Sequence, residues 1–258
     1  MIDGACGPRI RWLFTDRFGG SSRRPYDEMN LATHVGDTES AVLANRNAAA
    51  RRLVSTSSNA EGFDLATPVT PRVVAIRAVH GSSIAVADDS TLNEVGDVDG
   101  LVSRTPGIAL LAMAADCVPM VMADPVGVIA VVHAGWRGLA SGVALAAIDS
   151  LVDAGAQVES IECILGPAIC GRCYPVDQAR YDEVVEREPS AASMSATGQV
   201  SLDIRIGIAA QLARRGVSVT QVGPCTYESH DYFSYRRDAV TGRHGALITL
   251  TSDQGSSS

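Results

Sequence analysis

Two histidines and one cysteine of this sequence each follow a predominantly apolar run. The three runs are residues 73–79, 108–115 and 126–132. Short apolar runs bounded by turn residues predict buried strands. The first run is followed by His80, the second by Cys117 after a single aspartate, and the third by His133. Proteins built of strands and helices keep much of their chemistry at strand ends, so these three residues are the first candidates for a functional site.

One thiolate and two imidazoles form a ligand set that catalytic zinc uses, with the fourth coordination position left for water or substrate. The three residues lie far apart in the sequence and form no compact metal signature such as H-E-x-x-H. Taken singly, Cys117 also fits a small core residue, and His80 and His133 also fit hydrogen-bonded turn residues. A shared metal site and three separate structural roles therefore both stay open on residue types alone.

A glycine-flanked turn follows His133 and predicts the start of a helix over residues 139–152. Arg137 lies in this turn, where the backbone N–H groups at a helix start favour an anion. The alternative for Arg137 is a salt bridge that holds the turn. Trp136 beside it can stack on a base or simply pack against the protein.

Composition predicts one globular domain spanning residues 1–258, with residues 253–258 as a frayed tail. The net charge of −8 argues against a general nucleic-acid-binding surface. The apolar runs are too short to span a bilayer, and residues 1–8 lack the features of a signal peptide. We therefore expect a cytoplasmic protein with reduced thiols, and no nucleic-acid or membrane partner.

All 21 basic residues are arginine. The absence of lysine excludes a lysine Schiff base, and it excludes the P-loop lysine of the usual nucleotide hydrolases. Arginine can still bind phosphate, because its planar guanidinium donates two parallel hydrogen bonds. An anionic small-molecule substrate thus stays compatible with the composition.

The remaining patterns mix strands and helices without a regular βαβ period. Further strands are expected at residues 10–15, 120–123, 160–165, 220–223 and 246–250, and further helices at residues 39–53, 177–187 and 204–215. The two runs around Asp124-Pro125 predict a hairpin. We therefore predict an α+β protein, a mixed sheet with helices outside it.

Many ordered motifs of the chain resemble the YfiH-like, or multicopper polyphenol oxidase-like, family. The shared motifs are Pro25-Tyr26 with Asn30-Leu31, His34-Val35-Gly36-Asp37, Asn45-Arg46, Val79-His80-Gly81, Ala115-Asp116-Cys117-Val118-Pro119, His133-Ala134-Gly135-Trp136-Arg137-Gly138, Leu165-Gly166-Pro167-Ala168-Ile169, Cys173-Tyr174, Leu202-Asp203, Ser234-Tyr235-Arg236-Arg237 and Thr241-Gly242-Arg243. The resemblance covers nearly the whole chain. It implies a single-domain α/β/β/α sandwich with mixed β-sheets.

The resemblance also implies that His80, Cys117 and His133 bind zinc and take part in catalysis. Activities known in the family are phosphorolysis of adenosine, inosine, guanosine and methylthioadenosine, and hydrolytic deamination of adenosine. Nucleosides and phosphate are then the expected partners of a monomer or homodimer. For deamination zinc would activate the attacking water, and for phosphorolysis the site needs an anion-binding group and a proton donor or electrophile near the base.

Four further residues are expected near the substrate. Asn30 and Arg46 match family positions that line the pocket, and we predict that Arg46 contacts phosphate while Asn30 orients ribose or phosphate. Asp116 is interpreted either as a proton carrier or as a support for the adjacent ligand. Arg137 is the fourth expected substrate contact, by its place at the helix start.

Three other functions compete with a zinc nucleoside enzyme. A multicopper oxidase needs many histidine ligands, and five histidines are too few, although copper bound in vitro could oxidise phenols. A hydrolase of peptidoglycan precursors could use Cys117 as nucleophile with His80 or His133 as base. A non-catalytic binding protein could hold a structural metal.

A second cysteine feature is the C-x-x-C pair Cys170 and Cys173. Such pairs occur in redox sites and in structural zinc sites. Because no second pair follows, and Cys163 and Cys225 are isolated in the sequence, we interpret the pair as two reduced thiols near the pocket rather than half of a four-cysteine zinc site.

Overall fold

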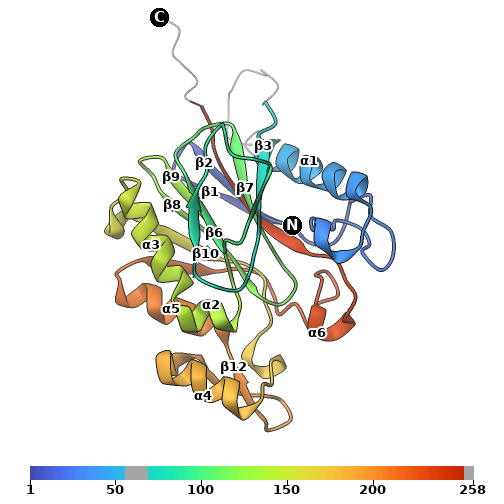
Figure 1. Ribbon diagram of the computed structural model, residues 1–258, viewed down its shortest axis with the longest axis vertical. Coiled ribbons are helices and arrows are strands. Elements are labelled where there is room, and N and C mark those ends of the chain that lie inside the picture. The colour runs from blue at the N-terminus through green and yellow to red at the C-terminus, as the bar shows by residue number, and fades with distance from the viewer. Residues whose placement is uncertain (56–68, 253–258) are drawn as a thin grey trace, which may run out of the picture.

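Two mixed six-stranded sheets face each other in the computed structural model, which describes residues 1–55 and 69–252 (Figure 1). The predicted tail, residues 253–258, lies outside the described residues. The first sheet has the order β1 (Ile2–Cys6), β2 (Ile10–Phe14), β14 (His244–Leu250), β7 (Ile108–Ala114), β3 (Arg72–Arg77) and β5 (Glu94–Gly96). The second has the order β13 (Ser218–Gln221), β10 (Glu162–Leu165), β8 (Val118–Asp124), β9 (Val128–Ala134), β6 (Gly100–Ser103) and β4 (Ile84–Val86).

The two central strands of the second sheet, β8 and β9, are buried along their whole length because both faces of the sheet are covered. In β9, Ile129 and Val131 belong to the core between the sheets, whereas Ala130 and Val132 belong to the core beneath the helices. The predicted hairpin around Asp124-Pro125 is confirmed, with β8 and β9 paired antiparallel. This hairpin carries two of the three candidate ligands, so its rigidity fixes their spacing.

Helices cover the outer face of each sheet and complete the predicted α/β/β/α sandwich (Figure 1). Helix α1 (Glu39–Ser55) packs on the first sheet, and α2 (Trp136–Ser141), α3 (Val143–Asp153) and α5 (Ile204–Arg214) lie against the second. The other elements are α4 (Gln178–Arg187), α6 (Tyr235–Asp238), the β11 (Ala192–Met194) and β12 (Val200–Leu202) ribbon, and the 3₁₀ helices η1 (Thr33–Val35), η3 (Val158–Ser160), η4 (Gly171–Cys173) and η5 (Pro189–Ala191).

The prediction of one helix over residues 139–152 is wrong, because the segment forms two helices, α2 and α3. Gly142 separates them with φ of 77°, a left-handed conformation that favours glycine. Its N–H group caps the end of α2, and the chain then changes direction into α3. The predicted helices 177–187 and 204–215 agree closely with α4 and α5, each capped by an aspartate side chain.

The first predicted strand, 73–79, is shorter than expected. Strand β3 ends at Arg77, so His80 lies in the connection that follows the strand rather than directly at its end. Because β3 belongs to the first sheet and β4 to the second, this connection crosses between the sheets. The crossing brings His80 from one sheet to the end of a strand in the other. Among the described residues, no helix is long and apolar enough to cross a membrane.

Candidate metal centre and active-site cavity

The three residues singled out by the sequence come together in the structure. One ligand atom from each of His80, Cys117 and His133 lies within 4.8 Å of the other two. The imidazole rings of His80 and His133 meet edge to face, with 4.7 Å between their centroids. The structure thus places a thiol and two imidazoles where one metal ion could contact all three.

The hairpin and the crossing connection position these side chains. His133 lies opposite Pro119 in the β8–β9 register, and Cys117 directly precedes β8, so the two residues are close neighbours across the hairpin. His80 approaches from the crossing connection with φ of 64°, a left-handed conformation that is uncommon for a non-glycine residue. Such conformations cluster at functional sites, where the surrounding structure holds them.

A carboxylate that sequence reasoning missed, Asp99, holds two of these residues. Asp99 is fully buried, and its Oδ1 accepts a hydrogen bond from the backbone N–H of His80 at 2.8 Å, while its Oδ2 accepts one from Gly81 at 2.6 Å. Its Oδ1 also lies 3.2 Å from Nδ1 of His133. Because an ionised carboxylate only accepts, Nδ1 of His133 must carry the proton, which leaves Nε2 free to bind a metal.

The charges at this site are coupled. Burial favours the neutral thiol of Cys117, but the charge of His133 and hydrogen bonds from His133 and His80 outweigh it and lower the pKa of Cys117 to about 6. Burial also opposes a charge on His133, but the thiolate of Cys117 and the carboxylate of Asp99 raise its pKa to about 9. In the metal-free protein these groups thus favour a thiolate beside an imidazolium.

The space around the three side chains fits a bound metal ion. A Cβ atom added at Gly135 would lie 3.0 Å from Cδ2 of His80 and 3.1 Å from Sγ of Cys117, so glycine keeps the backbone clear of both ligands. The thiol, the two imidazoles and the carboxylate behind His133 are the donor chemistry of a three-ligand zinc site. Three donors leave one tetrahedral position for another molecule.

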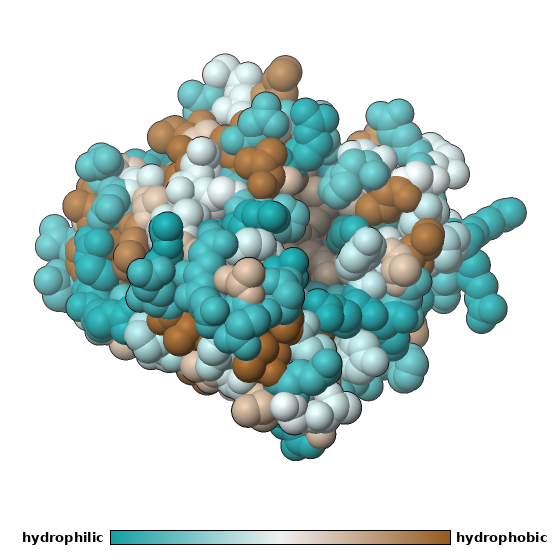
Figure 2. All heavy atoms as spheres, turned by 60° about the horizontal axis from the view of Figure 1, so that its bottom comes forward, coloured by the Kyte–Doolittle hydropathy of each residue, from teal (hydrophilic) through white to brown (hydrophobic). Residues whose placement is uncertain are grey.

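A cavity of about 230 Å³ opens beside the cluster. Its lining residues are Ala115, Asp116, Cys117, Gly135, Trp136, Ile169, Tyr174, Arg180, Ile204, Tyr235 and Arg236. The helices α4 and α6, which supply Arg180, Tyr235 and Arg236, lie at the lower end of the molecule in Figure 1. Figure 2 turns that end forward and shows a hollowed, largely hydrophilic face. The cavity therefore joins one candidate metal ligand, Cys117, to aromatic and cationic side chains.

Two arginines that sequence reasoning did not select line the cavity and give it positive charge. Arg180 has a buried Nε with no hydrogen-bond partner, although its Nη2 pairs with Asp177 at 3.5 Å. Arg236 lies 4.9 Å above the ring of Tyr174. A buried unpaired donor in a cavity wall is costly unless a ligand satisfies it. No sequence motif marks Arg180, because it lies on an amphipathic helix among other charged residues.

Asp116, one of the residues expected near the substrate, lines the same cavity. Its Oδ1 accepts a hydrogen bond from Oγ1 of Thr226 at 2.7 Å, and its Oδ2 accepts one from the backbone N–H of Arg236 at 2.6 Å. Its φ of 96° is again unusual for a non-glycine residue. Both oxygens are thus engaged, which favours the supporting role over that of a proton carrier.

The other expected substrate contacts lie elsewhere. Asn30 is fully buried, and its side chain bonds Ala32, Asp37 and the backbone N–H of Arg243. Arg46, on α1, pairs with Glu94 at 3.0 Å and donates to the carbonyl of Leu31.

Arg137 is exposed and lies 4.4 Å above the ring of Trp136, which Arg180 also approaches at 4.9 Å. Asn30, Arg46 and Arg137 are not among the residues that line the cavity. Their contacts with substrate stay predictions.

Sequence comparison finds relatives over nearly the whole chain. A family model described as multi-copper polyphenol oxidoreductase laccase matches residues 11–251. The chain is 44% identical over 240 residues to a Streptomyces coelicolor protein named purine nucleoside phosphorylase, covering 92% of this chain and 94% of that protein. A Mycobacterium tuberculosis protein of the same name is 41% identical over 249 residues, covering 96% and 94%.

Solved structures share the fold. A Neisseria meningitidis protein of the DUF152 family has a TM-score of 0.81 and 31% identity, covering 97% of this chain and 98% of its own. The YfiH protein of Bacillus licheniformis has a TM-score of 0.82 and 28% identity, covering 94% and 93%. The predicted single-domain sandwich therefore agrees with the architecture of these proteins.

Proposed function

The chain belongs to the family described as multi-copper polyphenol oxidoreductase laccase, and we propose that it is a purine nucleoside phosphorylase. Relatives that align along more than nine-tenths of the chain carry this name. The observation that carries the proposal is the juxtaposition of the His80, Cys117 and His133 cluster with a cavity that Arg180 and Arg236 line. An electrophilic centre and an anion-binding wall are the two elements that phosphorolysis requires.

The residues of the cavity suit the two substrates. In phosphorolysis an oxygen of phosphate forms a bond to the anomeric carbon of ribose, and the bond from that carbon to the purine nitrogen breaks with its electron pair on the base. Arg180 and Arg236 would hold the phosphate by charge-assisted hydrogen bonds. Tyr174 and Ile169 give the base an aromatic and apolar wall. The carboxylate of Asp116 would position Arg236 by accepting the hydrogen bond from the backbone N–H group of Arg236.

We further propose that zinc is the resident metal, held by His80, Cys117 and His133. A bound zinc ion would act as a Lewis acid beside the cavity. Asp99 would fix the tautomer of His133 that leaves Nε2 free for the metal. We extend the proposal to methylthioadenosine as a substrate and to deamination of adenosine.

The multicopper alternative receives no support from the arrangement of histidines. Among the described residues, two side-chain clusters have the donors and spacing for a metal, and only His80 and His133 of the five histidines belong to them. The coupled copper centres of a multicopper oxidase use many more histidine ligands. One copper ion bound in place of zinc stays compatible with the site.

A second candidate function rests on the same residues. The lowered pKa of Cys117, the adjacent imidazole of His133 and the carboxylate of Asp99 behind that imidazole form a Cys-His-Asp arrangement typical of thiol hydrolases. Such an enzyme could act on peptidoglycan precursors. A thiolate nucleophile must be free of tightly bound metal, so alkylation of Cys117 that zinc blocks would favour the metal site over the hydrolase.

Product analysis with metal-quantified protein tests the proposal. Adenosine, inosine and methylthioadenosine are each incubated with and without phosphate, and the products are separated by chromatography. We expect free base to appear only with phosphate, and activity to be lost in His133→Ala but kept in His230→Ala, an exposed histidine outside the cluster. Absence of turnover by fully zinc-loaded protein would reject the phosphorylase.

A further inference from the structure

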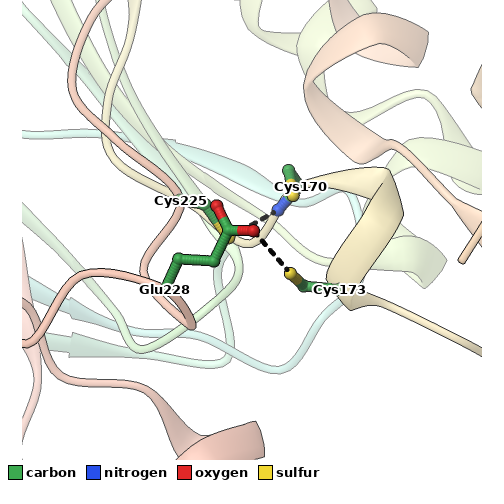
Figure 3. Close-up of side chains that lie close together, drawn as sticks. All are labelled: Cys170, Cys173, Cys225 and Glu228. Carbon is green, nitrogen blue, oxygen red and sulfur yellow. Dashed lines mark hydrogen bonds between the residues drawn. The ribbon is translucent and has the colours of Figure 1, made fainter. Parts of the chain in front are cut away.

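A second group of metal-ligand side chains lies away from the His80 cluster. Cys170, Cys173, Cys225 and Glu228 each offer one ligand atom, and these four atoms all lie within 4.8 Å of one another. Figure 3 shows the three sulfur atoms and the carboxylate of Glu228 pointing toward a common point. The structure thus joins the C-x-x-C pair to a cysteine that is isolated in the sequence.

The backbone around the cluster is regular and well bonded. Cys170 caps the 3₁₀ helix η4 and Cys173 ends it, with the N–H of Cys173 donating to the carbonyl of Cys170 at 3.0 Å. The N–H of Cys170 donates to Sγ of Cys225 at 3.3 Å. Ala168 and Cys225 form an isolated parallel β-bridge. Backbone contacts therefore hold both segments that supply ligands.

The spacing fits a tetrahedral zinc ion. Sγ of Cys173 lies 3.5 Å from Oε1 of Glu228. Zinc bonds of about 2.3 Å to sulfur and 2.0 Å to oxygen place two such ligands about 3.5 Å apart at the tetrahedral angle. Three thiolates and one carboxylate fill all four positions, which is the closed coordination of structural zinc.

The two segments that supply the ligands of this cluster both continue into residues at the cavity. Its first segment continues into Ile169 and Tyr174, which line the cavity. Its second segment continues into Thr226, whose hydroxyl donates to Asp116 at 2.7 Å. An ion bound by ligands from both segments would hold one wall of the cavity and the carboxylate of Asp116 in place.

We propose that Cys170, Cys173, Cys225 and Glu228 bind a structural zinc ion that clamps one wall of the active-site cavity. The site is closed with four ligands, whereas the His80, Cys117 and His133 site has three and stays open to another molecule. The two sites therefore differ in thiolate count, and metal binding can be assigned to each separately. This inference does not depend on the phosphorylase activity.

Metal binding to variants of the full chain tests the proposal. The host is the double variant His80→Ala with Cys117→Ala, which removes two of the three ligands of the open site. Protein is loaded with zinc or cobalt under reducing conditions, freed of excess metal and quantified for metal. We expect two zinc ions in the parent chain and one in the host. The cobalt form of the host should show strong thiolate-to-cobalt charge-transfer absorption.

Removing a ligand of the second site in the host should then abolish binding. We expect no retained metal when Cys173→Ser or Cys225→Ser is added to the host. Cys163→Ala in the host is the matched control, because Cys163 is a buried thiol outside the cluster, and it should keep one ion. The exposed Glu228→Gln variant guards against misfolding, and we expect it to bind zinc at least tenfold more weakly while keeping the native circular dichroism spectrum.

Three results would overturn the proposal. One is a reduced, folded host that retains no zinc and shows no thiolate-to-cobalt absorption. Another is unchanged zinc content after Cys173→Ser and Cys225→Ser, which would place the ion elsewhere. A disulfide among Cys170, Cys173 and Cys225 in protein purified without reductant, detected as a loss of two mass units, overturns it if reduction does not restore zinc binding.

Discussion

The side chain of Asp99 offers the sharpest test of how the proposed metal centre is held. Its two oxygens receive three donors, the backbone N–H groups of His80 and Gly81 and Nδ1 of His133. An Asp99→Asn substitution keeps the volume but turns one acceptor into a donor. Whichever way the amide is turned, its N–H₂ group faces at least one N–H donor.

The two orientations of the new amide have different costs. If the amide nitrogen of residue 99 faces Gly81, one partly buried backbone donor loses its partner, at about 1 kcal/mol of folding stability. If it faces His133, it also faces the backbone N–H of His80, which loses its partner. In that orientation the amide can donate only to an unprotonated Nδ1 of His133, which moves the imidazole proton to Nε2 and blocks metal binding. Loss of such an orienting carboxylate typically lowers metal affinity about 10- to 100-fold, or about 1.4–2.7 kcal/mol.

Zinc affinity measured by competition with a chelating dye separates these effects from general destabilisation. The matched control is Asp124→Asn, because Asp124 is also fully buried and also accepts backbone N–H groups, those of Val126 and Gln157. Asp124 ends β8 at the turn, about 17 Å along the hairpin from His133 at 3.3 Å per residue. Both variants should melt at lower temperature, and only Asp99→Asn should lose zinc affinity.

One outcome would refute the reasoning. If Asp99→Asn binds zinc as tightly as the parent chain, while its melting temperature falls as in Asp124→Asn, Asp99 only stabilises the loop and does not set the tautomer of His133. The metal would then bind without help from the carboxylate.

Three other perturbations have defined outcomes. In metal-free protein, alkylation of Cys117 should follow a pKa of about 6, so the alkylation rate levels off above pH 7 and falls tenfold per pH unit well below pH 6. Zinc should suppress the alkylation. Alkylation unaffected by zinc would exclude Cys117 as a ligand. Arg180→Ala should raise the KM for phosphate about tenfold or more through loss of a charge-assisted contact, whereas Arg187→Ala on the same helix, outside the cavity lining, should not. Gly135→Ala should weaken zinc binding without preventing folding, because its methyl group presses on two ligands at 3.0 and 3.1 Å; equal zinc affinity would show that those ligands can move aside.

The sequence predicted strands well where burial on both faces produces a continuous apolar run, as in β8 and β9. It failed at Gly142, because composition favours one helix while a single left-handed residue divides it. It also placed His80 at a strand end, although the chain leaves β3 earlier to cross between sheets. Apolar periodicity reports burial, and it does not report where the chain changes sheets.

At the site, too, the sequence predicts what depends on neighbouring residues and does not predict what depends on tertiary contacts. His80, Cys117 and His133 could be chosen from residue types after apolar runs, and the fold then brings them together. Asp99 has only a weak signal, an Asp-Gly pair before a short strand. Cys225 has none, because it lies 55 residues from Cys170 and meets it only through tertiary contacts, a hydrogen bond from the Cys170 N–H group and a β-bridge to Ala168.

The net charge of the chain does not predict the charge at the cavity. The chain carries −8 overall, yet Arg180 and Arg236 line the cavity and Arg137 and Arg243 approach its aromatic residues. Burial lowers the pKa of Arg243, against the attraction of Cys117 and Asp116. Guanidinium groups stay charged under such conditions where an ammonium would lose its proton more readily. A lysine-free chain can therefore keep a cationic cavity, and its phosphate affinity should weaken as salt screens the exposed arginines.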